Sequence, residues 1–232
     1  MKTNMKRWNT PAPNQAARPT FWKKISGGLG AARALQLAII KLAQGTGYVA
    51  PVVTLEFGGR ATGEPHQVLQ VACDIAEYLP DVCFPTASPL VMSVARTFWE
   101  KATAAHVFCA QGRIRSERYA RHWHDLAAIA RSPHFRVAIS DRDVATAVAR
   151  HKSCFFIEKD AQGRVIDYHA ATAGGLKVVP QGEAKKALAR DYKAMLADEI
   201  MIRNALPFDE LLRECAGFEV KVNEAITTAS CR

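Results

Sequence analysis

Two segments with the apolar spacing of α-helices constrain the fold of this 232-residue chain more than any other feature. In the first segment, apolar residues recur at positions i, i+4, i+7 and i+11, namely Phe98, Ala102, Ala105 and Cys109. In the second segment, the corresponding apolar residues are Tyr119, Trp123, Leu126 and Ala130. This periodicity predicts two amphipathic helices. The short run between them contains Gly112, which predicts an antiparallel pair.

Polar residues lie beside both apolar stripes. Lys101 is at the edge of the first stripe, and Arg118, Arg121 and Asp125 gather on another side of the second helix. These residue types suit a phosphate-bearing ligand, because the cations bind phosphate and the carboxylate orients a donor or a metal. The alternative is a solvent-exposed ion pair between Arg121 and Asp125, with the aromatic residues serving only the core.

The positive charge is concentrated in the first quarter of the chain. The net charge is +9, and residues 1–55 contain eight Lys or Arg and no Asp or Glu. Residues 56–232 are nearly balanced, with 23 basic and 22 acidic residues. A basic arm of this kind favours contact with nucleic acid. A disordered leader without a ligand has the same composition, and both interpretations stay open.

The remaining patterns predict an α+β fold in three parts. Residues 1–25, with three prolines, are expected to be a basic disordered lead-in. Residues 26–93 are expected to combine a helix with strands, and residues 94–232 to be helical. The helix is predicted at 29–44, and strands are predicted at 49–57, within 65–78, and at 82–85 and 90–93. Later helices are predicted around 144–151, 182–196 and 208–225.

Several classes of protein are excluded by the sequence. No run approaches the roughly 18 apolar residues of a membrane helix. The first twenty residues lack the apolar centre of a secretory signal. The six cysteines are scattered and include no C-x-x-C pair, which argues against a zinc site and a disulfide framework. The chain is therefore expected to be cytoplasmic, with reduced thiols and no membrane contact.

Four motifs carry a resemblance to a known family. They are LEFGGRATGEP (55–65), TFWEK (97–101), RYARHWHDL (118–126) and HKSCFF (151–156). Together they resemble the AbiEii/AbiGii nucleotidyltransferase toxins of toxin–antitoxin and phage-defence systems, over about residues 49–225. Members of that family have a nucleotidyltransferase fold followed by a helical region. The resemblance therefore implies an incomplete nucleotidyltransferase-type mixed sheet within residues 26–93.

The resemblance also implies an activity and a set of site residues. A nucleotide would be transferred from a nucleoside triphosphate to an acceptor such as tRNA, with Mg²⁺ as cofactor and a cognate antitoxin as a partner. Lys101 would contact the triphosphate, and Asp125 would orient the base or the acceptor. Glu56, on the 49–57 strand, would be a metal ligand. The expected substrate-binding residues are Arg60, Arg118, Arg121 and Lys152.

One half of the family's metal motif is missing from its usual place. A glycine pair and a D-x-D sequence normally precede the LEFG strand, whereas here Gly27-Gly28 is followed by no carboxylate before Glu56. The only literal D-x-D, Asp141-Arg142-Asp143, has the position of a helix N-cap. The expected protein is therefore a truncated toxin, weakly active or inactive alone. The alternative is a non-catalytic remnant or RNA-binding module with a basic arm.

Overall fold

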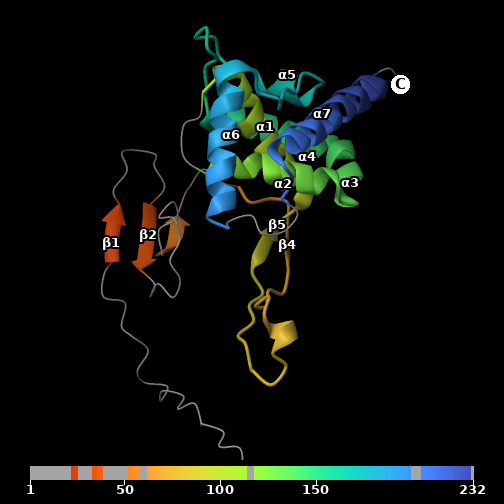
Figure 1. Cartoon of the computed structure of the whole chain (residues 1–232). Helices are drawn as coiled ribbons and strands as arrows, with labels where there is room; N and C mark the ends of the chain where they lie inside the picture. The colour runs from red at the N-terminus through yellow and green to blue at the C-terminus, as the bar shows by residue number, and fades with distance from the viewer. Residues whose placement is uncertain are drawn as a thin grey trace, which may run out of the picture. The chain divides into compact units, whose positions relative to one another are not determined.

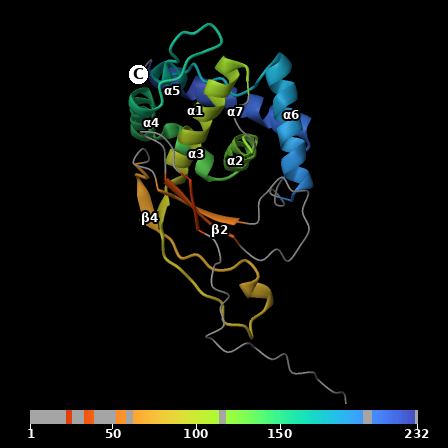
Figure 2. The same cartoon turned by 90° about the vertical axis from the view of Figure 1, so that its left-hand side faces the viewer.

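The computed structural model describes residues 22–25, 33–38, 52–57, 62–113, 118–199 and 205–230. The chain divides into two compact units, Met1–Ala61 and Thr62–Arg232, and each is described by itself. Figures 1 and 2 show strands in both units and helices in the second. The predicted α+β class is confirmed.

The first unit contains a three-stranded antiparallel sheet. Its strands are β1 (Trp22–Ile25), β2 (Arg33–Ala38) and β3 (Val52–Phe57), in the order β1-β2-β3. The strand predicted at 49–57 is confirmed by β3. Every strand pair among the described residues is antiparallel, so the sheets seen there are not mixed.

The helix predicted at 29–44 is wrong for its described part, because β2 is a strand. A six-residue apolar window fits helical and extended periodicity equally well. Pairing with β1 on one edge and β3 on the other supplies the backbone hydrogen bonds that a helix would make internally. The flanking residues of that prediction, and most of the expected lead-in, lie outside the described part of the chain.

The second unit begins with a β-hairpin that Figure 1 shows leading away from the helices. Strand β4 (His66–Val68) pairs antiparallel with β5 (Leu90–Met92), and the 3-10 helix η1 (Ala76–Tyr78) lies near its tip. The strand predicted at 90–93 is confirmed, whereas the strand predicted at 82–85 is wrong. Pro85 removes a backbone donor from that segment, which disfavours a ladder.

The seven helices described in the second unit include all those predicted beyond residue 94. They are α1 (Val94–Gln111), α2 (Arg121–Ala130), α3 (His134–Ser140), α4 (Arg142–Phe155), α5 (Tyr168–Thr172), α6 (Gly182–Ala197) and α7 (Phe208–Ser230). The short helices α3 and α5 were not anticipated, because seven and five residues carry too little periodicity. Asp141 is the N-cap of α4, as its position predicts, and its Oδ1 accepts a hydrogen bond from the amide of Val144 at 3.0 Å.

Helix α1 is the centre of the helical unit. It contacts α2, α3, α4 and α5, and Figure 2 shows it running among the other helices. Phe98 and Trp99 are fully buried, and the Trp99 indole donates a hydrogen bond to the carbonyl of Ala138 in α3 at 2.9 Å. Ser93 caps the start of α1, and Gly112, with a φ of 66°, ends it in the left-handed conformation that glycine favours. The polar residues of α1 are thus held on a rigid element.

Among the described residues, none of the helices has both the length and the apolar character required to cross a membrane.

Candidate functional site

Lys101 of α1 and Asp125 of α2 meet between the two helices. The Lys101 Nζ lies 2.7 Å from the Asp125 Oδ2, and the side chains are 22% and 39% exposed. The two residues therefore share one surface, as the placement beside the two apolar stripes predicts. Their expected catalytic roles stay predictions.

His122 marks the centre of a group of cations. Burial, together with the charges of Lys101, Arg121 and Lys152, lowers the pKa of this imidazole to about 4, against the opposing effect of Asp125. His122 is therefore neutral near pH 7. The residues predicted for phosphate binding at 101, 121 and 152 thus all affect the ionisation of one imidazole.

Arg118 does not belong to the same helix face. It lies before α2 with a φ of 62°, so the predicted Arg118–Arg121–Asp125 face is wrong at its first member. The carboxylate of Asp191 in α6 accepts hydrogen bonds from the backbone amides of Arg118 at 2.8 Å and Ala120 at 2.7 Å. These two bonds attach the start of α2 to α6, which replaces the helical turn expected there.

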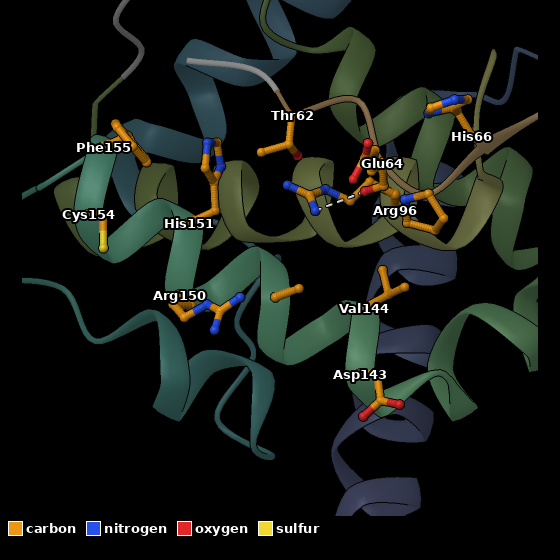
Figure 3. Close-up of a pocket in the computed structure, with 12 residues that line it drawn as sticks. Thr62, Glu64, His66, Arg96, Asp143, Val144, Arg150, His151, Cys154 and Phe155 are labelled. Atoms are coloured by element: carbon orange, nitrogen blue, oxygen red, sulfur yellow. Dashed lines mark hydrogen bonds between the residues drawn. The ribbon is translucent and has the colours of Figure 1, made fainter. Parts of the chain in front are cut away.

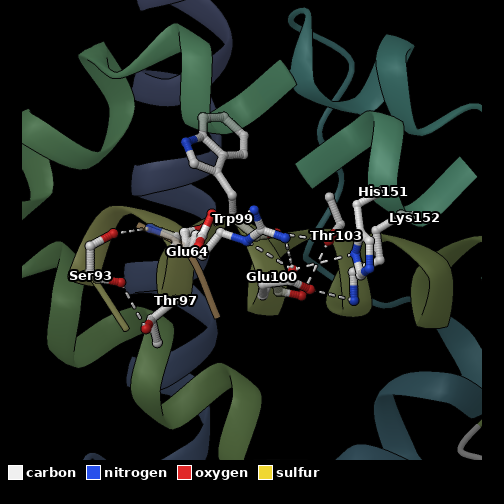
Figure 4. Close-up of polar contacts among 9 residues, drawn as sticks. Glu64, Ser93, Thr97, Trp99, Glu100, Thr103, His151 and Lys152 are labelled. Atoms are coloured by element: carbon white, nitrogen blue, oxygen red, sulfur yellow. Dashed lines mark hydrogen bonds and ion pairs between the residues drawn. The ribbon is translucent and has the colours of Figure 1, made fainter. Parts of the chain in front are cut away.

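Glu100, next to Lys101, is the hub of a second polar cluster (Figure 4). Its Oε1 accepts hydrogen bonds from Arg96 Nε at 3.1 Å and from Arg96 Nη2 at 2.9 Å. Its Oε2 lies 2.6 Å from the Nζ of Lys152 in α4, and the His151 Nδ1 lies 3.9 Å from Oε1. Burial raises the pKa of the Glu100 carboxyl, but Lys152 and Arg96 outweigh it, and the pKa is lowered overall. Glu100 is therefore ionised.

This cluster changes the interpretation of Lys152. Its ammonium is paired with Glu100 and lies 4.6 Å from the centre of the Phe156 ring. Sequence reasoning did not single out Glu100 or Arg96 as site residues. The signals were present, because Arg96 and Glu100 are four residues apart on one helix and Glu100 belongs to the TFWEK motif.

An open pocket of about 780 Å³ adjoins the Glu100 cluster (Figure 3). Arg96 and His151 belong to both. The pocket is formed by the segment preceding β4 and by α1 and α4. Its lining residues are Thr62, Glu64, Pro65, His66, Arg96, Asp143, Val144, Ala147, Arg150, His151, Cys154 and Phe155.

The described residues do not form a site for Mg²⁺. No group of three or more His, Cys, Asp or Glu side chains converges in the part of the chain that the structure describes. The carboxylates nearest the cations, Glu100 and Asp125, are already paired with Lys or Arg. Glu56 lies on β3, in register with Ala34 of β2, and Arg60 lies outside the described residues.

An α+β protein with an open pocket lined by Arg96 of α1 and Arg150 of α4 is suited to bind a phosphate-bearing ligand. The family model of the nucleotidyl transferase AbiEii toxin, type IV toxin–antitoxin system, matches residues 15–214. The chain belongs to this family of nucleotidyltransferase toxins. No curated protein matches the chain, and no solved structure matches it.

Proposed function

We propose that this toxin takes part in transferring a nucleotide from a nucleoside triphosphate to an RNA acceptor such as tRNA. The observation that carries the proposal is the Lys101–Asp125 contact of 2.7 Å between α1 and α2. The charges of Lys101, Arg121 and Lys152 all lower the pKa of His122, so these cations act on one part of the helical unit. Positive charge there attracts a triphosphate. Lys101 binds a phosphate oxygen, and Asp125 then orients the acceptor or the base.

The remaining predicted residues have supporting roles in this proposal. Arg121 is exposed, and within the described residues it has no ion pair, so its guanidinium is available to a phosphate. Lys152 contributes charge while it holds Glu100. Arg118 and Arg60 are proposed to contact the RNA or the triphosphate. The cytoplasm, where triphosphates and tRNA are found, is the proposed compartment.

Mg²⁺ is proposed as the cofactor, and Glu56 is the carboxylate of this chain offered to it. Metal-assisted phosphoryl transfer requires several converging carboxylates, and residues 1–55 contain none. We therefore propose that this chain alone transfers little nucleotide, and that a second polypeptide with a D-x-D motif supplies the other ligands. The type IV toxin–antitoxin family implies an antitoxin partner, and direct contact with it is not needed for this proposal.

The test is incubation of the purified chain with labelled nucleoside triphosphates, Mg²⁺ and total tRNA. Labelling should be low for the chain alone and should appear when a polypeptide with the glycine pair and D-x-D motif is added. Lys101→Ala and Asp125→Ala should abolish that labelling, whereas Lys185→Ala, an exposed lysine on α6, should not. Strong labelling by the chain alone, lost in Glu56→Ala, would refute the need for a second polypeptide. Absence of labelling in every mixture would refute the proposed transfer.

RNA binding without catalysis is the second candidate, and the charge of residues 1–55 favours it. Residues 1–55 contain eight cations and no carboxylate, and cations bind RNA phosphates by releasing counterions. The binding constant for single-stranded RNA should fall steeply with added salt. In the full chain, replacing Lys2, Lys6 and Arg7 by Ala should reduce the slope of log K against log salt by about 2, if all three contact phosphates. An unchanged slope would exclude the arm as the binding element.

A further inference from the structure

The pocket beside Glu100 combines an aromatic wall with cations. The Phe155 side chain is 53% exposed although it is large and apolar. Val144 and Ala147, about three and two turns earlier in α4, supply apolar lining, and Arg150 supplies an exposed guanidinium. A pocket with this lining accommodates a ligand that is flat and apolar on its faces and polar at its edge.

His151 is an incompletely satisfied member of this pocket. Its side chain is only 9% exposed, and its Nδ1 is a buried nitrogen without a hydrogen bond, 3.9 Å from Glu100 Oε1. The imidazole packs against Phe155, with ring centres 5.0 Å apart, and Figure 3 shows both rings rising from α4 on the same side. A buried polar atom without a partner costs free energy. A ligand edge could remove that cost after the ring turns about its Cβ–Cγ bond.

The pocket adjoins the Glu100 cluster, which contains one of the cations that the proposed function uses. Arg96 and His151 line the pocket and also face Glu100. The other carboxylate oxygen of Glu100 lies 2.6 Å from the Nζ of Lys152. Glu100 therefore links the pocket to the Lys152 ammonium.

We propose that this pocket binds a nucleobase, with Phe155 as the stacking surface and His151 and Arg150 as donors to the base edge. Nucleobases stack on aromatic side chains in proteins and are read by hydrogen bonds to their edges. The inference rests on the proposed function and names the subsite next to its phosphate-binding cations. The base belongs either to a free nucleoside triphosphate or to an unpaired nucleotide at the end of an RNA.

The experiment compares ligands with and without a base. Binding of each nucleoside triphosphate, of a four-nucleotide unpaired RNA and of inorganic triphosphate is measured on the full chain by calorimetry and by saturation-transfer NMR of the base protons. Phe155→Ala should weaken binding of the base-containing ligand about 5- to 100-fold, from the usual contribution of one stacked base. His151→Phe retains the ring but removes the nitrogens, and it should also weaken that binding. Neither variant should change binding of inorganic triphosphate.

The experiment distinguishes a base of the free nucleotide from a base of the RNA. It also distinguishes failure of the pocket assignment from failure of the proposed function. If Phe155→Ala and His151→Phe weaken binding of a nucleoside triphosphate, the base in the pocket is that of the free nucleotide. If they weaken binding of the RNA alone, the base is that of the acceptor. The exposed His134 provides the control variant, His134→Ala, which should bind every ligand as the original chain does. Unchanged base binding in Phe155→Ala and His151→Phe would overturn the pocket assignment and leave the proposed function standing. If the two variants lose binding of inorganic triphosphate to the same extent, the pocket assignment is also overturned. If the original chain binds none of the ligands, both the pocket assignment and the proposed function are refuted.

Discussion

The Nζ of Lys101 lies 2.7 Å from the Oδ2 of Asp125, and this contact joins α1 to α2 at a partly exposed surface. A short ion pair at such a site contributes little to folding, because water already solvates both charges and screens their attraction. The pair therefore contributes little to the stability of the two helices. Substitutions in this pair should therefore weaken ligand binding without a large change in the free energy of unfolding.

Lys101→Met and Asp125→Asn should each change the free energy of unfolding by less than about 1 kcal/mol, because water still screens this partly exposed pair. Urea titration followed by circular dichroism measures this change. The same Lys101→Met protein should bind inorganic triphosphate more weakly, because a cation has been removed. A loss of several kcal/mol in either variant would instead assign the pair a structural role.

Glu100→Gln should destabilise the helical unit far more than the Lys101 and Asp125 variants. The substitution leaves Arg96 and Lys152, whose side chains are 5% and 14% exposed, without their shared carboxylate. Leaving buried cations unpaired should cost about 2–3 kcal/mol. Glu183 is the matched control, since its pair with Lys186 is largely exposed. Glu183→Gln should shift the urea midpoint very little, and equal shifts for both variants would contradict the expected effect of burial.

Stability should fall as the pH is lowered from about 6.5 to about 4, and His122 should be a main cause. Burial, aided by neighbouring cations, lowers the pKa of His122 to about 4, whereas the pKa in the unfolded chain has its ordinary value of 6.5. Between these values the unfolded state binds more protons, so stability rises with pH there and is lost on acidification. The maximum effect of this residue is about 3 kcal/mol.

Urea midpoints at several pH values, compared between the original chain and His122→Phe, measure the contribution of His122. The variant should lose less stability on acidification. Part of the decrease should remain, because burial also lowers the pKa of His106 and of His124. Identical pH profiles for the two proteins would exclude His122 as the cause.

Asp191→Ala should loosen the start of α2. The variant removes the acceptor for the backbone amides of Arg118 and Ala120, which should cost about 1–2 kcal/mol, as the loss of a helix cap does. Hydrogen exchange at these two amides should accelerate selectively. Arg190→Ala, an exposed substitution next in α6, is the control and should leave both exchange rates unchanged. Unchanged exchange in Asp191→Ala would mean that other contacts hold this segment.

Different parts of the site were predictable to different degrees. The position of Lys101 beside Asp125 followed from two apolar stripes, because long amphipathic helices allow few ways to pack. Arg118 was misplaced because its positive φ and its attachment to Asp191 depend on α6, far along the chain. Likewise β2 was predicted as a helix because six residues fit both periodicities, and only its two strand partners distinguish them.

The sequence by itself determined the elements beyond residue 94 with strong periodicity, the concentration of basic charge in residues 1–55, and the family. Each of these is a property of contiguous residues or of motifs. Only the tertiary structure decided which charges are paired. Lys152 of α4 pairs with Glu100 of α1, whereas Arg121 stays without an ion pair among the described residues. The reason is physical: an ion pair needs atoms within a few ångströms, and the packing of α4 and α2 on α1 sets those distances.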